Sequence, residues 1–203
     1  MVRLFLALLL VAAQAAILGL ALFAPRVSAT HRAYYLDHTT QCWLRDGQGD
    51  IPATDTIRPA SLDPDTFCRL LPVGWALEEP FGRASHGAWS SRAATEIRLP
   101  LRPGDRSVRL TLRGYAPDTP APGAQPVTIS MPGAAPIAAQ MPHRGEATLC
   151  VPVPPGVREA LPIAIAIAHP GRPSLAGDAH DPRATGLELV EIRRGRDTDC
   201  GGG

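Results

Sequence analysis

Apolar and polar residues alternate over much of the chain after position 90. Large apolar side chains occupy every second position in five runs, at residues 95–101, 107–113, 127–131, 147–153 and 163–167. This alternation is typical of β-strands with one face on a core and the other toward solvent or a second layer. A sixth run, residues 186–192, departs from it at Leu189 and Val190, and a β-bulge is the simplest account.

Turn-forming residues separate these runs. Proline or glycine occurs between them at residues 103–105, 117–123, 132–133, 143–145 and 154–156. Short strands at intervals of about 8–12 residues with such turns are typical of a β-sandwich or barrel. The chain also carries 22 prolines, which break helix interiors. The sequence therefore predicts an all-β domain over residues 74–194.

Less regular segments flank this domain. Residues 30–73 are expected to form an irregular lead-in with a short helix over residues 64–71. Residues 195–203 form a polar, glycine-rich tail, which we expect to be mobile except at Cys200. The predicted organisation is a leader at residues 1–29, the lead-in at 30–73, the sandwich at 74–194 and the tail at 195–203.

The leader contains an apolar run at residues 4–24, broken only by Gln14. A transmembrane helix needs roughly 20 mainly apolar residues, whereas a cleaved signal peptide has a shorter apolar stretch and a small-residue cleavage site. Arg3 and the triplet ending at Ala29 fit a signal peptide, but the run is long for one. The sequence thus predicts a single transmembrane or signal helix, and we favour an uncleaved signal-anchor.

The four cysteines indicate on which side of the membrane the domain lies. Arg3 on one side and Arg26 and Arg32 on the other leave the positive-inside rule nearly balanced. All the cysteines lie after residue 40, as suits folding in an oxidising compartment. We therefore predict a single-pass inner-membrane protein whose domain is periplasmic or extracellular, the alternative being secretion to the periplasm.

Four cysteines allow three pairings. We favour Cys42–Cys68, which would close the lead-in on itself, and Cys150–Cys200, which would hold the tail. The sequence has no Cys-x-x-Cys pair of the kind that zinc sites use, so no metal site is expected. The net charge of +1 gives no electrostatic case for nucleic-acid binding.

An ordered set of motifs runs through the predicted sandwich. Gly74-Trp75 leads to Glu78-Glu79-Pro80 and then to Gly87-Ala88-Trp89-Ser90, and residues 181–187 read Asp-Pro-Arg-Ala-Thr-Gly-Leu before the last strand. This order resembles the carbohydrate-binding-module-like accessory domains that accompany bacterial surface-polysaccharide glycosyltransferases and related membrane proteins. The resemblance implies a jelly-roll β-sandwich near carbohydrate. Thr185 replaces a usual aliphatic residue, and Met131-Pro132-Gly133 replaces a frequent Asn-Gly hairpin.

Several motif residues are candidate ligand-binding residues. Trp75 and Trp89 could stack on sugar rings while Glu78, His86 or Arg92 bond hydroxyls, or both rings could pack in the core. Asp181 and Arg183 could bind a ligand group, or they could tie a loop to the sheet by an ion pair. The acidic loop at residues 178–181 could donate oxygens to calcium, although a hydrated loop is the simpler interpretation.

No catalytic signature is visible. Glu78 and Glu79 are adjacent and would point to opposite faces of a strand, so they would not flank one glycosidic bond. Ser85-His86 lacks a third group that would orient a relay. We therefore expect no catalytic residue and no cofactor. The leading hypothesis is a membrane-anchored, non-catalytic module that binds glycan or docks to a membrane polysaccharide-synthesis enzyme. The alternatives are a structural or protein-interaction domain without ligand, or a small hydrolase.

Overall fold

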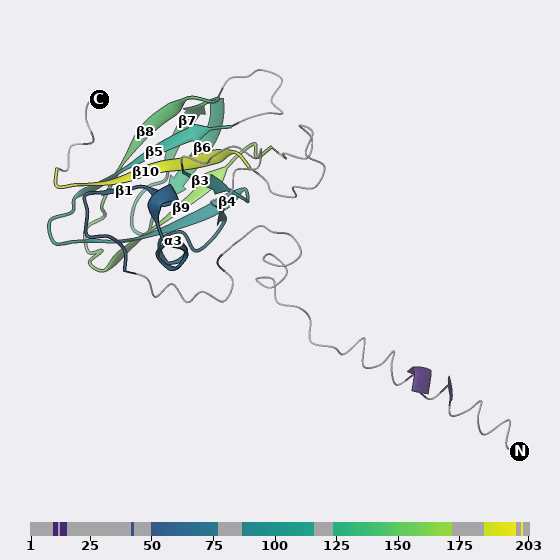
Figure 1. Ribbon diagram of the computed structural model, residues 1–203. Helices are drawn as coiled ribbons and strands as arrows, with labels where there is room; N and C mark the ends of the chain where they lie inside the picture. Colours follow the sequence, from purple (N-terminus) through teal and green to yellow (C-terminus); the bar gives the residue numbers. More distant parts are fainter. Residues whose placement is uncertain are drawn as a thin grey trace, which may run out of the picture.

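Two antiparallel sheets face each other in the computed structural model, and they form a β-sandwich (Figure 1). The structure describes residues 10–11, 13–15, 42, 50–76, 87–115, 124–171, 185–197 and 200. The all-β fold predicted from the alternating pattern is therefore confirmed.

The larger sheet has six strands. Its order is β2 (Trp75–Ala76), β3 (Ala88–Ser90), β10 (Leu187–Gly195), β5 (Ser107–Gly114) and β8 (Glu146–Pro152), with β1 (Thr56–Ile57) pairing to β10. The smaller sheet has the order β4 (Ala94–Pro100), β9 (Ala160–Ile167), β6 (Ala124–Ser130) and β7 (Ile137–Pro142). From β3 onward the chain passes from one sheet to the other at every connection except the β6–β7 hairpin.

The core lies between the sheets and follows from the alternation. In β5, Val108, Leu110 and Leu112 are fully buried, whereas the residues between them face away from the core. The inward side chains of β9 repeat this pattern with Leu161 and three isoleucines. The predicted strands correspond to β4, β5, β6, β8, β9 and β10, each within a few residues of its expected bounds.

The predicted bulge in the last strand is present. The register of β10 against β5 shifts between Leu189 and Glu191. Leu189 and Ile192 consequently both point into the core although they are three residues apart. The strands β1, β2, β3 and β7 were not predicted, since the first three are too short to show a period.

The lead-in contributes to the core through a short helix. The helix α3 (Pro64–Leu70) follows a 3-10 turn, η1 (Pro59–Ser61), and begins where the Asp63 carboxylate accepts the backbone N–H groups of Asp65 and Thr66. Phe67 and Leu70 of α3 are fully buried. The helix predicted at residues 64–71 is thus confirmed, and it packs beside β4, an edge strand of the four-stranded sheet.

Both favoured cysteine pairings are present. Cys42 is bonded to Cys68 in α3, and Cys150 in β8 is bonded to Cys200 in the tail. Two such bridges indicate an oxidising environment outside the cytoplasm. Of the leader, only residues 10–11 and 13–15 are described, and they are helical. Within the described residues, no helix is both long enough and apolar enough to cross a membrane.

Candidate functional site

The outer face of the six-stranded sheet carries a line of polar side chains along β5. Arg109, Thr111 and Arg113 alternate with the buried core residues of this strand, and Tyr115 follows them just past its end. Side chains on one face of a strand recur every second residue, at about 6.6 Å. We call these four residues the β5 row.

Arg113 connects the carboxylates of two neighbouring strands. Its Nη1 lies 2.6 Å from Oε2 of Glu188 in β10, and its Nη2 lies 2.5 Å from Oε1 of Glu146 in β8. The side chain of Glu188 is only 1 % exposed, whereas that of Glu146 is 47 % exposed. Because a buried carboxylate needs a partner, Glu188 fixes Arg113 in place. Glu146 and part of the guanidinium remain accessible to a ligand.

An aromatic cluster lies at the end of the β5 row. The rings of Trp89 and Tyr115 meet edge to face at a centroid distance of 6.2 Å, and Tyr115 stacks on His143 at 5.7 Å. Trp89 is directly opposite Glu188 in the register of β3 and β10, so the cluster and the charged group of Arg113 adjoin. The three rings come from β3, the end of β5 and the β7–β8 turn.

The indole N–H of Trp89 has no hydrogen-bond acceptor among the described residues, although Trp89 is only 6 % exposed. Buried donors are almost always paired with protein or ordered water. The cluster thus presents a donor that a bound hydroxyl oxygen or water molecule would satisfy.

The two motif tryptophans have separate environments. Trp75 is fully buried in the core, and its indole N–H donates to the carbonyl of Glu96 at 3.0 Å. In the β2–β3 pairing Trp75 is opposite Ser90 and Trp89 is opposite Ala76, so the two rings lie on opposite faces of the sheet. This corrects the expectation of a shared stacking surface. The other candidates, Glu78, His86, Asp181 and Arg183, lie outside the described residues.

Other residues of the motif hold the sandwich together. The Oγ of Ser90 accepts the backbone N–H groups of Gly186 and Leu187 at 2.9 and 3.0 Å, which joins the two ends of the motif. Gly87 has no room for a side chain, because a Cβ would lie 2.2 Å from the carbonyl oxygen of Leu189. The spacing of the motif residues therefore follows from the packing of β3 against β10.

A second charged group lies at the opposite end of β5. Arg194 is buried, and its guanidinium donates to the carbonyls of Pro52, Thr54 and Pro100 beside the Asp105 carboxylate. Burial lowers the pKa of Arg194, and the neighbouring Arg102 lowers it further. This group is structural, since Arg194 binds backbone groups that fasten residues 52–54 to the sandwich.

Within the described residues, no three His, Cys, Asp or Glu side chains are grouped so that they could hold a metal ion. Arg113, Tyr115 and His143 were not among the candidate ligand-binding residues predicted from the sequence. The alternation of residues 107–113 predicted an outward direction for Arg113 alone, and the partners Glu188 and Trp89 come from strands far away along the chain.

Comparison with known proteins gives structural similarity only. The sequence matches no protein-family model and no curated protein. Among solved structures, the chain is similar to the CBM35 of Cellvibrio japonicus Abf62, with a TM-score of 0.34 and 12% identity over 57% of this chain and 80% of that one. It is also similar to an exo-beta-1,3-galactanase from Phanerochaete chrysosporium, with a TM-score of 0.32 and 14% identity over 54% of this chain and 21% of the enzyme.

A further similar structure is the Cry4Aa toxin of Bacillus thuringiensis, with a TM-score of 0.33 and 11% identity over 53% of this chain and 19% of the toxin. The chain thus spans about a fifth of the galactanase and of the toxin. These proteins differ widely in activity, and such low similarity assigns neither a family nor a function to this chain.

Proposed function

We propose that this protein is a non-catalytic, exported jelly-roll module that binds a glycan along the β5 row. The observation that carries the proposal is the indole N–H of Trp89, which has no acceptor among the described residues and lies beside a line of hydrogen-bonding side chains. Sugars present closely spaced hydroxyls, each of which can both donate and accept. The β5 row with Glu146 offers hydroxyl, guanidinium and carboxylate groups on one sheet face, so it suits such a ligand.

The setting of the module is part of the proposal. We propose that the apolar run at residues 4–24 anchors the chain in the inner membrane, with the sandwich on the periplasmic or extracellular side. The two disulfides support that side of the membrane. A module held there would meet glycans as they are assembled or exported, and it would lie close to a membrane polysaccharide-synthesis enzyme.

Glycan binding is tested with the full chain in a non-ionic detergent. A glycan array identifies the ligand, and calorimetry then compares variants. We expect Trp89→Phe, which removes the indole donor, and Glu146→Gln, which removes an accessible charge, each to weaken binding at least tenfold.

The matched control is Glu96→Gln on the outer face of the four-stranded sheet, since Glu96 also pairs with an arginine, Arg98. Its affinity should equal that of the unaltered chain. Equal losses in Glu96→Gln and Glu146→Gln would locate binding away from the β5 row, and an array without any bound glycan would refute glycan binding. The anchor is tested separately by alkaline extraction of membranes and by protease protection of the domain.

The burial of both tryptophans favours a second candidate function, a structural or protein-interaction domain without a small ligand. Trp75 is fully buried and Trp89 nearly so, and neither ring offers an open face. Under this alternative the array is empty, and cross-linking in intact cells captures a membrane protein partner. A bound glycan whose affinity depends on Glu146 would exclude it.

A further inference from the structure

Two arginines face each other directly on the outer face of the six-stranded sheet. The register of β10 on β5 places Arg193 opposite Arg109. Both belong to the outward set, because the residues beside them, Val108 and Ile192, are buried in the core. Directly opposed side chains have Cβ atoms about 5 Å apart, and like charges in that position destabilise a sheet.

The surrounding carboxylates do not balance this pair. Glu191 is shared between Arg58, at 3.4 Å, and Arg193, at 3.7 Å. Arg109 makes no ion pair and no side-chain hydrogen bond within the described part of the chain. Among the described residues, Arg58 and Arg193 thus share one carboxylate, and Arg109 beside them has none.

Arg113 has a different environment from Arg109. Arg113 lies on the same face of the same strand and has a carboxylate on each side, Glu188 and Glu146. At Arg109 the corresponding neighbours are Arg193 on β10 and Cys150 on β8. Among the described residues, one end of the β5 row is thus neutralised from within the fold, and the other end carries more arginines than paired carboxylates.

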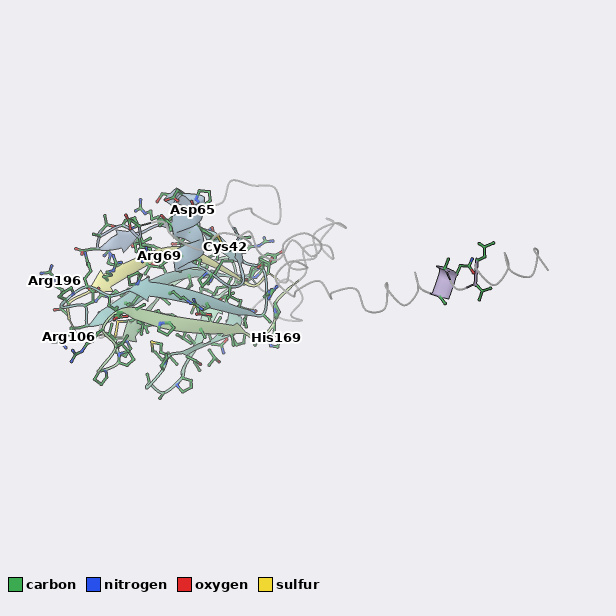
Figure 2. All side chains as sticks on the ribbon, turned by 90° about the horizontal axis from the view of Figure 1, so that it is seen from below. Cys42, Asp65, Arg69, Arg106, His169 and Arg196 are labelled. Atoms are coloured by element: carbon green, nitrogen blue, oxygen red, sulfur yellow. A yellow bond between two sulfur atoms is a disulfide. The ribbon has the colours of Figure 1, made fainter. Side chains whose placement is uncertain are left out.

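The surface around the pair leaves it accessible. Arg193 is 55 % exposed and Arg58 is 71 % exposed. The backbone N–H of Arg106 donates to the carbonyl of Gly195 at the end of β10, and Arg106 and Arg196 lie at one end of the molecule (Figure 2). The strand β8 contributes only the Cys150–Cys200 bridge beside Arg109, which brings no charge of its own.

We propose that Arg109 and Arg193 together bind an anionic group, a carboxylate or a phosphate, carried by the glycan on the β5 row. Guanidinium groups match both anions through paired N–H donors, and two of them can hold one anion from both sides. The inference rests on the proposed function for the nature of the ligand, and it adds that this glycan is acidic. Along the strand, the anionic group would lie about 13 Å from the level of Arg113.

The test compares two ligands that differ only in charge. Oligogalacturonate and its fully methyl-esterified form are titrated into the full chain in non-ionic detergent. We expect the acidic form to bind at least tenfold more tightly, with an affinity that falls as salt is raised. Arg109→Gln and Arg193→Gln should each abolish the preference. Arg98→Gln, on the other sheet, is the matched control and should keep it, and circular dichroism checks that each variant folds.

Each outcome either supports or overturns anion binding by Arg109 and Arg193. Equal binding of both ligands, or a preference that survives in Arg109→Gln, would overturn the arginine pair and leave glycan binding standing. If neither ligand binds, inorganic phosphate is titrated while the arginine side-chain NMR signals are followed. A saturable shift at Arg109 that is lost in Arg193→Gln would retain the anion site without the glycan, and no shift would overturn it. Phosphate that displaces oligogalacturonate shows that both anions use the same site.

Discussion

The hydroxyl of Ser90 accepts a hydrogen bond from the backbone N–H of Gly186 across 96 residues of sequence. The same oxygen also accepts the N–H of Leu187. Ser90 is fully buried, so no water replaces these bonds if the hydroxyl is lost. One side chain thus fixes the beginning of β10 against β3.

Replacement of Ser90 by alanine is therefore expected to be costly. Ser90→Ala would leave two buried backbone donors unsatisfied, at about 1–3 kcal/mol each. We expect the free energy of unfolding in urea to fall by about 2 kcal/mol or more. Ser130→Ala is the control, since Ser130 is exposed on β6 and should change stability by less than about 0.5 kcal/mol. Equal effects in the two variants would contradict this role.

A second prediction concerns Arg194. Arg194→Met would remove the donor to three backbone carbonyls and leave the buried Asp105 carboxylate with less compensation. Breaking a buried charged pair on one side costs about 3 kcal/mol or more. Chemical unfolding should show this loss, and proteolysis should cut near residues 52–54 first. Arg98→Met, at an exposed ion pair, is expected to be nearly neutral. An intact chain after proteolysis of Arg194→Met would argue against the fastening role.

The third prediction is an acid-sensitive stability. The hydrogen bond and charge of Arg102 hold the pKa of Asp55 below 3.8, and hydrogen bonds from Thr66 do the same for the pKa of Asp63. A carboxyl whose pKa is lower in the folded chain stabilises the fold above its unfolded pKa. That contribution is lost as the pH falls through the folded value. Stability should therefore decline below about pH 4.

A variant in which Asp55 and Asp63 cannot ionise measures how much these two groups contribute to the loss of stability at low pH. The double variant Asp55→Asn with Asp63→Asn keeps a good helix N-cap at position 63, and it no longer ionises at either position. Thermal unfolding between pH 2 and pH 6 should give a flatter curve below about pH 4 than for the unaltered chain. A superimposable curve would show that other groups dominate.

A fourth prediction addresses the bridge between β8 and the tail. Cys150 and Cys200 are separated by 50 residues. In the chain-entropy description, removing a disulfide that closes a loop of this length lowers the free energy of unfolding by up to about 4 kcal/mol. Cys200→Ser, studied with Cys150→Ser to avoid a free thiol, should lower the urea midpoint without changing the far-ultraviolet spectrum. Non-reducing peptide mapping of the unaltered chain should yield both expected pairs. A free thiol at Cys150 would refute the bridge.

The sequence predicted those elements whose two faces differ strongly. In β5 and β9, large apolar residues face residues of another size or polarity, so the period of two is visible. In β7 the inward Ala139 and the outward Ala138 are identical, and the contrast disappears. The three-residue strand β3 exists because it pairs with β10, and the two-residue strand β2 because it pairs with β3. The pairing with β10 is a long-range condition that no local pattern contains.

The candidate site was harder to predict than the strands, because it depends on long-range strand pairing. The outward direction of Arg109 and Arg113 follows from the alternation. Their different environments depend on whether β10 places Glu188 or Arg193 opposite them, and the bulge after Leu189 sets that register. The location of Trp75 in the core and Trp89 outside it likewise depends on how β2 and β3 pair.

The position of β10 has a consequence for how the chain is made. The last strand in the sequence lies in the middle of the six-stranded sheet, between β3 and β5. The pair β2–β3 and the pair β5–β8 cannot be joined into one sheet before residues 187–195 have emerged from the ribosome. The six-stranded sheet therefore stays incomplete until this strand has been made. Folding dominated by such distant pairings is also slow.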